Sequence, residues 1–151
     1  MDILDKAVKK LPPSSVTFIE ELIRTRSWWD TVDFLAANVA GKFFRIYPEM
    51  IRPVSTRWMD SDNIWLQRSC LLFQLKYRLG TDLDLLYSFI ERLKGSDEFF
   101  IRKAIGWVLR EYSKTDPAAV KNYVNTHNLK PLSRKEALKV ISKKEFKNVR
   151  L

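Results

Sequence analysis

The sequence has few of the residues on which disulfide frameworks, metal centres and phosphate-binding loops depend. One cysteine, Cys70, excludes an internal disulfide, and with a single histidine, His127, it argues against a zinc site. Four glycines are too few for a turn-rich β-sandwich or a glycine-rich phosphate loop. No apolar run approaches the ~18 residues of a membrane span, and the first residues do not resemble a signal peptide. We therefore expect a cytoplasmic protein with no membrane association, no metal and no other cofactor.

What the sequence does contain is an apolar share large enough for a core and a surplus of positive charge. Of 151 residues 46% are hydrophobic, and 27 Lys and Arg against 18 Asp and Glu give a net charge of +9. Such a surplus attracts polyanions, of which nucleic acid is the commonest inside cells. From Lys130 onward eight basic residues accompany two acids. This basic end could equally be a solvated, solubilising tail.

Apolar residues recur at helical spacing along nearly the whole chain, which predicts an all-α protein. Prolines, glycines and capping residues separate the segments, and Ser133 with Glu136 resembles a capping box. The expected helices cover residues 3–11, 27–39, 48–58, 63–79, 82–94, 98–113, 118–125 and 133–143, the one that starts near Ser27 breaking around Gly41. A further helix is expected after Ser14 or Ser15, with Phe18, Ile19, Leu22 and Ile23 on its apolar face.

Two of these helices begin with related strings 35 residues apart. Ser61–Arg68 aligns with Ser96–Lys103, and weaker echoes start at Ser27 and Ser133. A two-helix unit at this period is typical of an α-solenoid of HEAT-like repeats, whose inner helices line a concave face. We expect residues 1–143 to form one such domain and residues 144–151 to be a frayed basic tail.

The segment from Trp28 to Asp33 combines aromatic and acidic residues. Trp29 and Asp33 are four residues apart and share one helix face, whereas Trp28 with Val32 is typical of core packing. A carboxylate beside a tryptophan is harder to explain as core, because a buried Asp needs a partner. The alternative is that Asp30 and Asp33 only complement the helix dipole, and the spacing by itself favours it.

Basic residues alternate with tryptophans on the later inner helices. Arg68 follows Trp65 by three residues, and Lys103 and Arg110 share a helix with Trp107. On a concave face they would neutralise phosphates and offer stacking or cation–π contacts. The alternative is that the aromatic residues fill the core; it is preferred for Trp58, Phe73, Phe99 and Phe100, while Trp107 fits either interpretation.

Motifs for the common catalytic machineries are missing from the sequence. It has no P-loop, no Gly-x-Ser-x-Gly elbow, no cluster of metal ligands and no His paired for catalysis, since His127 reads as a residue at a helix end. Any catalysis would have to rely on a carboxylate, arginine and aromatic residues. That restricts the chemistry to reactions such as hydrolysis of an already activated glycosidic bond.

Four strings of the sequence, in order along the chain, closely resemble one known family. They are Ser27–Asp33, Ser61–Arg68, Glu98–Tyr112 and Pro131–Lys139. The family is that of DNA alkylation repair proteins, AlkD-like alkylpurine DNA glycosylases built from HEAT-like repeats. The resemblance extends to about Lys143 and implies a right-handed α-α superhelix.

The resemblance also implies a reaction and its residues. Family members hydrolyse the N-glycosidic bond of cationic alkylated purines, such as 7-methylguanine and 3-methyladenine, in double-stranded DNA. The residue matching the catalytic carboxylate is Asp33, and those matching the DNA-facing cleft are Trp29, Arg68 and Trp107. Lys103 and Arg110 are added as DNA-binding candidates because they flank Trp107. We expect a monomer without cofactor.

The sequence departs from the family in its length. Family members usually have additional helices before the segment that the first residues match, so the N-terminal repeats are expected to be absent. These repeats would contribute to the DNA-binding cleft. The alternative function is therefore a non-catalytic HEAT-like module that binds DNA or serves as a scaffold.

Overall fold

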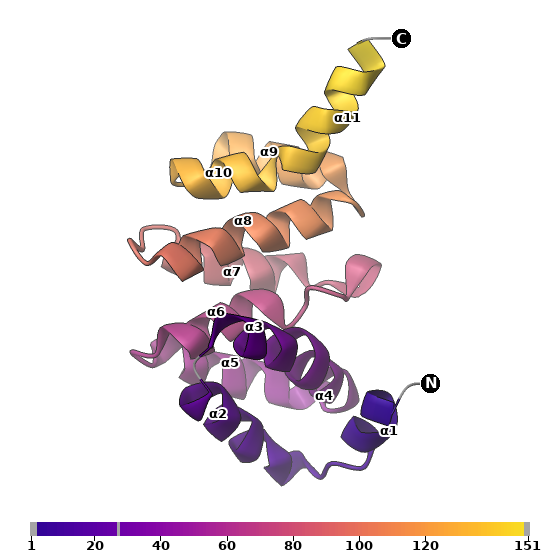
Figure 1. Cartoon of the computed structure of the whole chain (residues 1–151), viewed down its shortest axis with the longest axis vertical. Coiled ribbons are helices and arrows are strands. Elements are labelled where there is room, and N and C mark those ends of the chain that lie inside the picture. The colour runs from indigo at the N-terminus through magenta and orange to yellow at the C-terminus, as the bar shows by residue number, and fades with distance from the viewer. Residues whose placement is uncertain (1–2, 27, 150–151) are drawn as a thin grey trace. The chain divides into compact units, whose positions relative to one another are not determined.

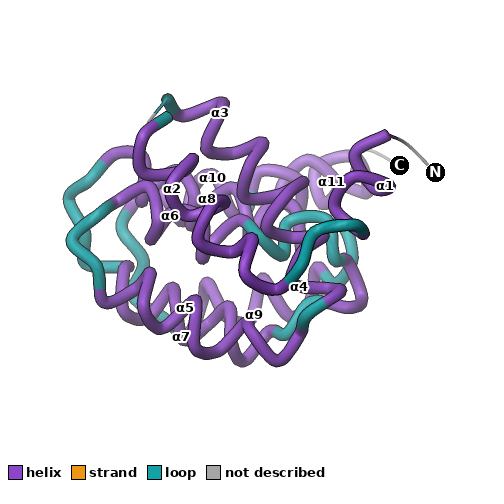
Figure 2. Tube along the Cα trace, turned by 90° about the horizontal axis from the view of Figure 1, so that it is seen from below, coloured by secondary structure: helices purple, strands orange, loops and turns teal. Residues whose placement is uncertain are grey.

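The protein is described by a computed structural model, in which residues 3–26 and 28–149 are placed. These residues form helices joined by short loops, with no strand among them (Figure 2). Three helices begin at Trp29, Ile64 and Phe99, so their starts are 35 residues apart. The predicted all-α helical repeat fold is confirmed. Ser27, near which the third helix was expected to start, lies outside the described residues.

The chain folds as two compact units, Met1–Lys76 and Tyr77–Leu151. The first unit holds six α-helices and three shorter helical turns in its described part (Figure 1). In chain order they are α1 (Ile3–Lys9), η1 (Pro13–Ser15), α2 (Val16–Thr25), α3 (Trp29–Phe34), η2 (Leu35–Ala40), α4 (Gly41–Ile46), η3 (Pro48–Met50), α5 (Ile51–Asp60) and α6 (Ile64–Leu72).

The core of the first unit is built around aromatic side chains. The Phe44 ring lies 5.0 Å from the ring of Phe73 and 5.9 Å from that of Trp58, at the steep angles that aromatic pairs prefer. All three side chains are fully buried, which confirms the prediction of core positions for Trp58 and Phe73. This core joins α4, α5 and the end of α6.

The helices α3, η2 and α4 follow one another without a loop. The middle segment, η2, is π-helical, and the Gly41 N–H donates to the carbonyl of Ala36, five residues earlier. The predicted break around Gly41 is therefore wrong. A Cβ at this position would lie 2.5 Å from the Phe73 carbonyl oxygen, so the glycine allows the close approach of α4 to the end of α6.

The second unit consists of five α-helices and one short turn in its described residues. They are η4 (Arg78–Gly80), α7 (Leu83–Leu93), α8 (Phe99–Ser113), α9 (Pro117–Thr126), α10 (Pro131–Ala137) and α11 (Lys139–Val149). Helices α8 and α10 lie side by side (Figure 1), and Ser133 and Ala137 of α10 are buried. Phe99 is 51% exposed, so the prediction that it lies in the core is wrong.

Most predicted helix starts are confirmed to within a residue or two, and three of them are capped by side chains. Asn63 accepts from the N–H groups of Trp65 and Leu66, Asp82 caps α7, and Asp116 caps α9. The helix predicted to reach Leu79 ends at Leu72, and Arg78 has a φ of 52°, which a right-handed helix cannot contain.

The C-terminal segment differs from its prediction in two ways. Helix α10 begins at Pro131, so Ser133 and Glu136 lie inside it and form no capping box; the Ser133 hydroxyl donates to the Arg102 carbonyl on α8 instead. Helix α11 continues to Val149, through residues 144–149 where a frayed tail was expected, and its Glu145 pairs with Lys121. None of the described helices has the length and apolarity to cross a membrane.

Candidate nucleic-acid interface

Asp33 and Arg68 form a buried ion pair within the first unit. The guanidinium donates twice, from Nε to Oδ1 at 2.7 Å and from Nη2 to Oδ2 at 3.0 Å. Asp33 is 8% exposed and Arg68 is 4% exposed. The partner that a buried Asp33 requires is thus the arginine one 35-residue period later. A bidentate pair of this kind fixes the orientation of both groups.

The burial of Arg68 changes its expected role. Arg68 was expected to contact a DNA phosphate. In this structure two of its guanidinium nitrogens bond to Asp33, and the side chain is buried. Its direct effect is to hold the carboxylate. A phosphate contact by Arg68 stays a prediction.

Two tryptophans are exposed at the start of α3. Trp29 lies one helical turn before Asp33 and is 47% exposed, which leaves an aromatic face open to solvent near the ion pair. Trp28 is 66% exposed, so the prediction that it packs in the core with Val32 is wrong, although Val32 itself is fully buried. The backbone at Trp28 is extended and precedes the helix, which turns its side chain away from the face that carries Val32.

The neighbouring acid, Asp30, has a local role. It lies in the first turn of α3 and accepts from the Thr31 N–H at 2.8 Å. This matches the interpretation that an acid at a helix start satisfies a free amide and complements the dipole. The same interpretation does not explain Asp33, whose partner is Arg68.

The other DNA-binding candidates lie in the second unit. Lys103, Trp107 and Arg110 are spaced along one face of α8, and all three are partly exposed. Glu136 on α10 accepts from Lys103 Nζ at 3.2 Å and from Arg110 Nη1 at 3.0 Å. The two basic candidates are thus brought together by a carboxylate that sequence reasoning had assigned to a helix cap.

The electrostatics of this group favour an ionised Glu136. The hydrogen bond from Lys103 is the largest effect and lowers the pKa of Glu136, and the nearby charges of Lys139 and Arg110 lower it further. Partial burial acts in the opposite direction but does not outweigh these contacts.

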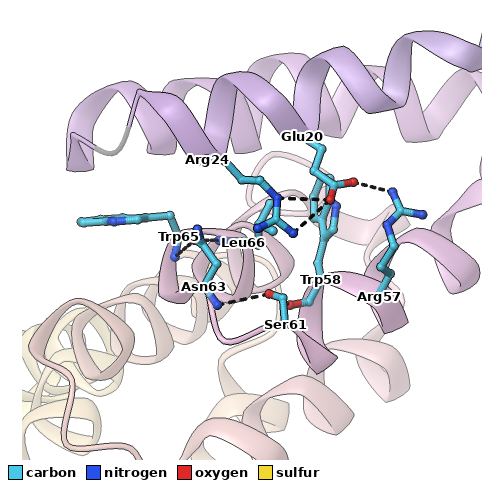
Figure 3. Close-up of polar contacts among 8 residues, drawn as sticks. All are labelled: Glu20, Arg24, Arg57, Trp58, Ser61, Asn63, Trp65 and Leu66. Carbon is cyan, nitrogen blue, oxygen red and sulfur yellow. Dashed lines mark hydrogen bonds and ion pairs between the residues drawn. The ribbon is translucent and has the colours of Figure 1, made fainter.

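A second carboxylate cluster, which sequence reasoning missed, stabilises the first unit. The Glu20 carboxylate on α2 accepts a hydrogen bond from Arg24 Nη2 at 3.2 Å and also pairs with Arg57 of α5 (Figure 3). Burial raises the pKa of Glu20, but the hydrogen bonds and charge of the arginines outweigh it, so that its pKa is below the ordinary value. The i,i+4 spacing of Glu20 and Arg24 was a readable signal, whereas the contact with Arg57 depends on the fold.

A stack of aromatic rings, also missed, lies between α7 and α9 in the second unit. Tyr123 stacks on Tyr87 and on His127, with centroids 4.0 Å apart in both pairs, and its hydroxyl donates to Glu91 at 3.0 Å. Burial, followed by the bond to Glu91, raises the pKa of Tyr123. His127 is the C-cap of α9, as expected for a residue at a helix end.

Groups that could hold a metal were also sought. Over residues 3–26 and 28–149, no three His, Cys, Asp or Glu side chains gather as a metal site requires.

Comparisons with known proteins agree with the family suggested by the sequence motifs. Residues 1–141 match the family model described as DNA alkylation repair enzyme. A solved structure, described as a predicted DNA alkylation repair enzyme from Enterococcus faecalis, superposes with a TM-score of 0.82 at 30% identity. The match covers 90% of this chain and 63% of that protein, so this chain spans less than two thirds of its length. A search of curated proteins finds no match. The family match over most of the sequence, on a helical repeat fold, places this chain in the DNA alkylation repair enzyme family, which supports a role in DNA repair.

Proposed function

We propose that the protein is a DNA glycosylase that removes cationic alkylated purines, such as 7-methylguanine and 3-methyladenine, from duplex DNA. The observation that carries the proposal is the carboxylate of Asp33, held in a fixed orientation by Arg68 one helical turn from the exposed Trp29. The net charge of +9 favours approach to a polyanion.

The chemistry suits a site with one carboxylate. Alkylation at N7 or N3 places positive charge on the purine and weakens its bond to deoxyribose. When the C1′–N bond breaks, the electron pair goes to the purine, which becomes neutral, and positive charge develops on the sugar. A carboxylate already oriented near the sugar stabilises that charge, and water then adds to C1′ and loses a proton.

Each of the other candidate side chains has a proposed part. Trp29 offers an electron-rich face to the cationic base or the developing sugar cation. Arg68 acts as a positioning residue, because it fixes both oxygens of Asp33 and leaves no freedom for the carboxylate to rotate away. Trp107, Lys103 and Arg110, on α8, are proposed to contact the DNA.

The departing base needs no general acid. Because the alkylated purine carries its own positive charge, it leaves as a neutral molecule without receiving a proton. The proposed site therefore requires neither a second carboxylate nor a histidine beside Asp33, in contrast to the two carboxylates of most glycoside hydrolases.

The test is release of free 7-methylguanine from methylated duplex DNA by the wild type and by the variant Asp33→Asn. We expect the variant to lose about 100-fold or more of the rate, because the stabilising negative charge is gone while the side chain keeps its shape. Asp30→Asn is the matched control, since it removes an acid three residues away whose contact is with its own helix start.

The outcomes of this experiment separate the proposed roles. Wild-type release together with an unchanged rate for Asp33→Asn would show that Asp33 is not the catalytic group. Equal losses in both variants would indicate a general effect of charge near α3.

A second candidate function is a non-catalytic module that binds duplex DNA. It is favoured by the basic net charge of +9, which attracts a polyanion whether or not a reaction follows. This alternative expects salt-sensitive binding without preference for alkylated DNA. Duplex binding by the wild type without any base release would select it over the glycosylase.

A further inference from the structure

The cluster of Lys103, Arg110 and Glu136 has an internal carboxylate at the place where basic side chains would bind phosphate. Two cations converge on one anion, with N···O distances of 3.2 and 3.0 Å. To a lysine or an arginine, a carboxylate and a phosphodiester are equivalent partners: both are oxyanions that accept charge-assisted hydrogen bonds. The cluster therefore resembles a phosphate site that is filled from within the protein.

The anionic partner is held in place by close packing. A Cβ added to Gly106 would lie 2.5 Å from the Cβ of Glu136 and 3.1 Å from the Ser133 carbonyl oxygen, so α10 touches the backbone of α8 here. The Ser133 hydroxyl bonds to the Arg102 carbonyl one turn earlier. With its Cβ fixed in this way, the Glu136 side chain is only 13% exposed.

The cationic partners are more exposed. The side chains of Lys103 and Arg110 are 39% and 28% exposed, and both have long flexible stems that can reorient toward an incoming anion. The half-buried Trp107 lies between them in sequence and on the same face of α8. The mobile members of the cluster are thus the two groups that could contact DNA.

We propose that Glu136 competes with duplex DNA for Lys103 and Arg110: the two side chains bind Glu136 in the free protein and exchange it for a backbone phosphate when DNA binds. Because the internal pairs must break before DNA can bind, their presence lowers the affinity of the wild type for any duplex. Glu136 therefore limits the binding of undamaged DNA. This inference rests on the proposed function, because it takes duplex DNA as the ligand.

The test measures binding of a fluorescein-labelled undamaged duplex by anisotropy at several KCl concentrations. Glu136→Gln keeps the size of the side chain and removes the competing charge. We expect it to bind about 3- to 10-fold more tightly than the wild type, as fits the loss of two partly exposed ion pairs. The slope of log K against log salt should stay the same, because the same cations contact the same phosphate in both proteins.

A matched control removes the same charge elsewhere in the second unit. Glu145→Gln breaks the ion pair between Lys121 and Glu145, whose side chains are 53% and 54% exposed. It raises the net charge by one, as Glu136→Gln does, but frees a lysine that is not on the face of Trp107. We expect less than about a twofold change in affinity.

A double-mutant cycle identifies the two cations as the route of the effect. In Lys103→Gln/Arg110→Gln the magnitude of the salt slope should fall by about one, since the contact of these cations with one phosphate is lost. Adding Glu136→Gln to this background should change nothing further, because the competing charge has no cation left to release.

The results distinguish this inference from the proposed function. If Glu136→Gln binds no more tightly than Glu145→Gln, or if the double variant keeps the wild-type salt slope, competition by Glu136 is wrong while the glycosylase proposal stands. If the wild type does not bind duplex DNA even at low salt, the proposed function fails and the competition fails with it.

Discussion

Basic residues one 35-residue period apart form different ion pairs in the two units: the pair in the first unit is buried, and those in the second unit are partly exposed. Arg68 on α6 and Lys103 on α8 are 35 residues apart, at equivalent positions of their helices. Arg68 binds a carboxylate on α3, Asp33, in a pair that is almost fully buried. Lys103 binds one on a following helix, Glu136, in a cluster whose two cations are partly exposed.

This difference shows that equivalent positions in a repeat need not have equivalent energetic roles. A buried pair costs desolvation, and its members cannot separate without leaving a charge in the protein interior. An exposed pair contributes little to stability, and its members can exchange partners with solvent or ligand. The buried pair suits a fixed catalytic group, and the exposed cluster suits contact with a polyelectrolyte.

The largest expected effect comes from breaking the buried pair. Arg68→Met should lower the free energy of unfolding by about 3–5 kcal/mol, because it leaves the Asp33 carboxylate buried without its partner. Lys103→Met should cost at most about 1 kcal/mol. Urea titrations followed by circular dichroism measure both values.

A further variant checks the reason for that difference. Asp33→Leu/Arg68→Met removes both charges and should recover most of the stability lost in Arg68→Met alone. Similar costs for Arg68→Met and Lys103→Met would mean that burial does not distinguish the two pairs.

An intermediate effect is expected at the two glycines that allow close helix contacts. Gly41→Ala and Gly106→Ala should each destabilise by about 1–3 kcal/mol, since the new Cβ would lie 2.5 Å from the Phe73 carbonyl oxygen or the Glu136 Cβ. We expect the larger loss at Gly41, because the seven-residue helix α10 can shift more easily than the aromatic core around Phe73.

Gly95 is the control for these substitutions. A Cβ at Gly95 meets no atom within 4 Å, so Gly95→Ala should be close to neutral in stability. Thermal unfolding of the three variants gives the order of their stabilities. A stabilising Gly41→Ala, as helix propensity alone predicts, would contradict the close approach.

The smallest effect is the pH dependence of the exposed cluster. Hydrogen bonding to Lys103 lowers the pKa of Glu136 below its ordinary 4.5. The stability that the charged Glu136 contributes is therefore fully present above pH 4.5. It is lost as the pH falls through the lowered pKa of the folded protein. The difference in stability between the wild type and Glu136→Gln should therefore shrink in acid, from at most about 1 kcal/mol. Urea titrations over an acidic pH series measure it, and a difference that grows in acid would contradict this linkage.

The sequence predicted the helical architecture more fully than the contacts between helices. Periodicity and the residues typical of helix starts, such as the Asp116–Pro117 pair, indicated where helices begin, because these signals are local. The need of a buried Asp33 for a partner was also readable, but Arg68 was not identified as that partner. The pairing depends on how α3 and α6 pack, which residue spacing does not reveal.

The incorrect predictions have the same cause: each followed a local rule, whereas the residue's position depends on how the helices pack. Gly41 was interpreted as a helix break and Ser133 with Glu136 as a capping box, since glycine and such acids have those roles locally. In the fold, Gly41 lies inside a continuous helix against the Phe73 carbonyl, and Glu136 faces α8. Trp28 and Phe99 were assigned to the core because of their helical spacing, yet each stands at a helix start, where the side chain reaches solvent.

The π-helical segment Leu35–Ala40 determines the directions in which the side chains before and after it point. A π-turn accommodates one residue more than an α-turn, so every side chain after it is rotated by about 100° relative to an uninterrupted α-helix. The helix that presents Asp33 to Arg68 can thereby also direct Phe43 and Phe44 into the core. Deleting a single residue between positions 35 and 40 would turn one of these two sets away from its partners, so this segment tolerates changes of side chain better than changes of length.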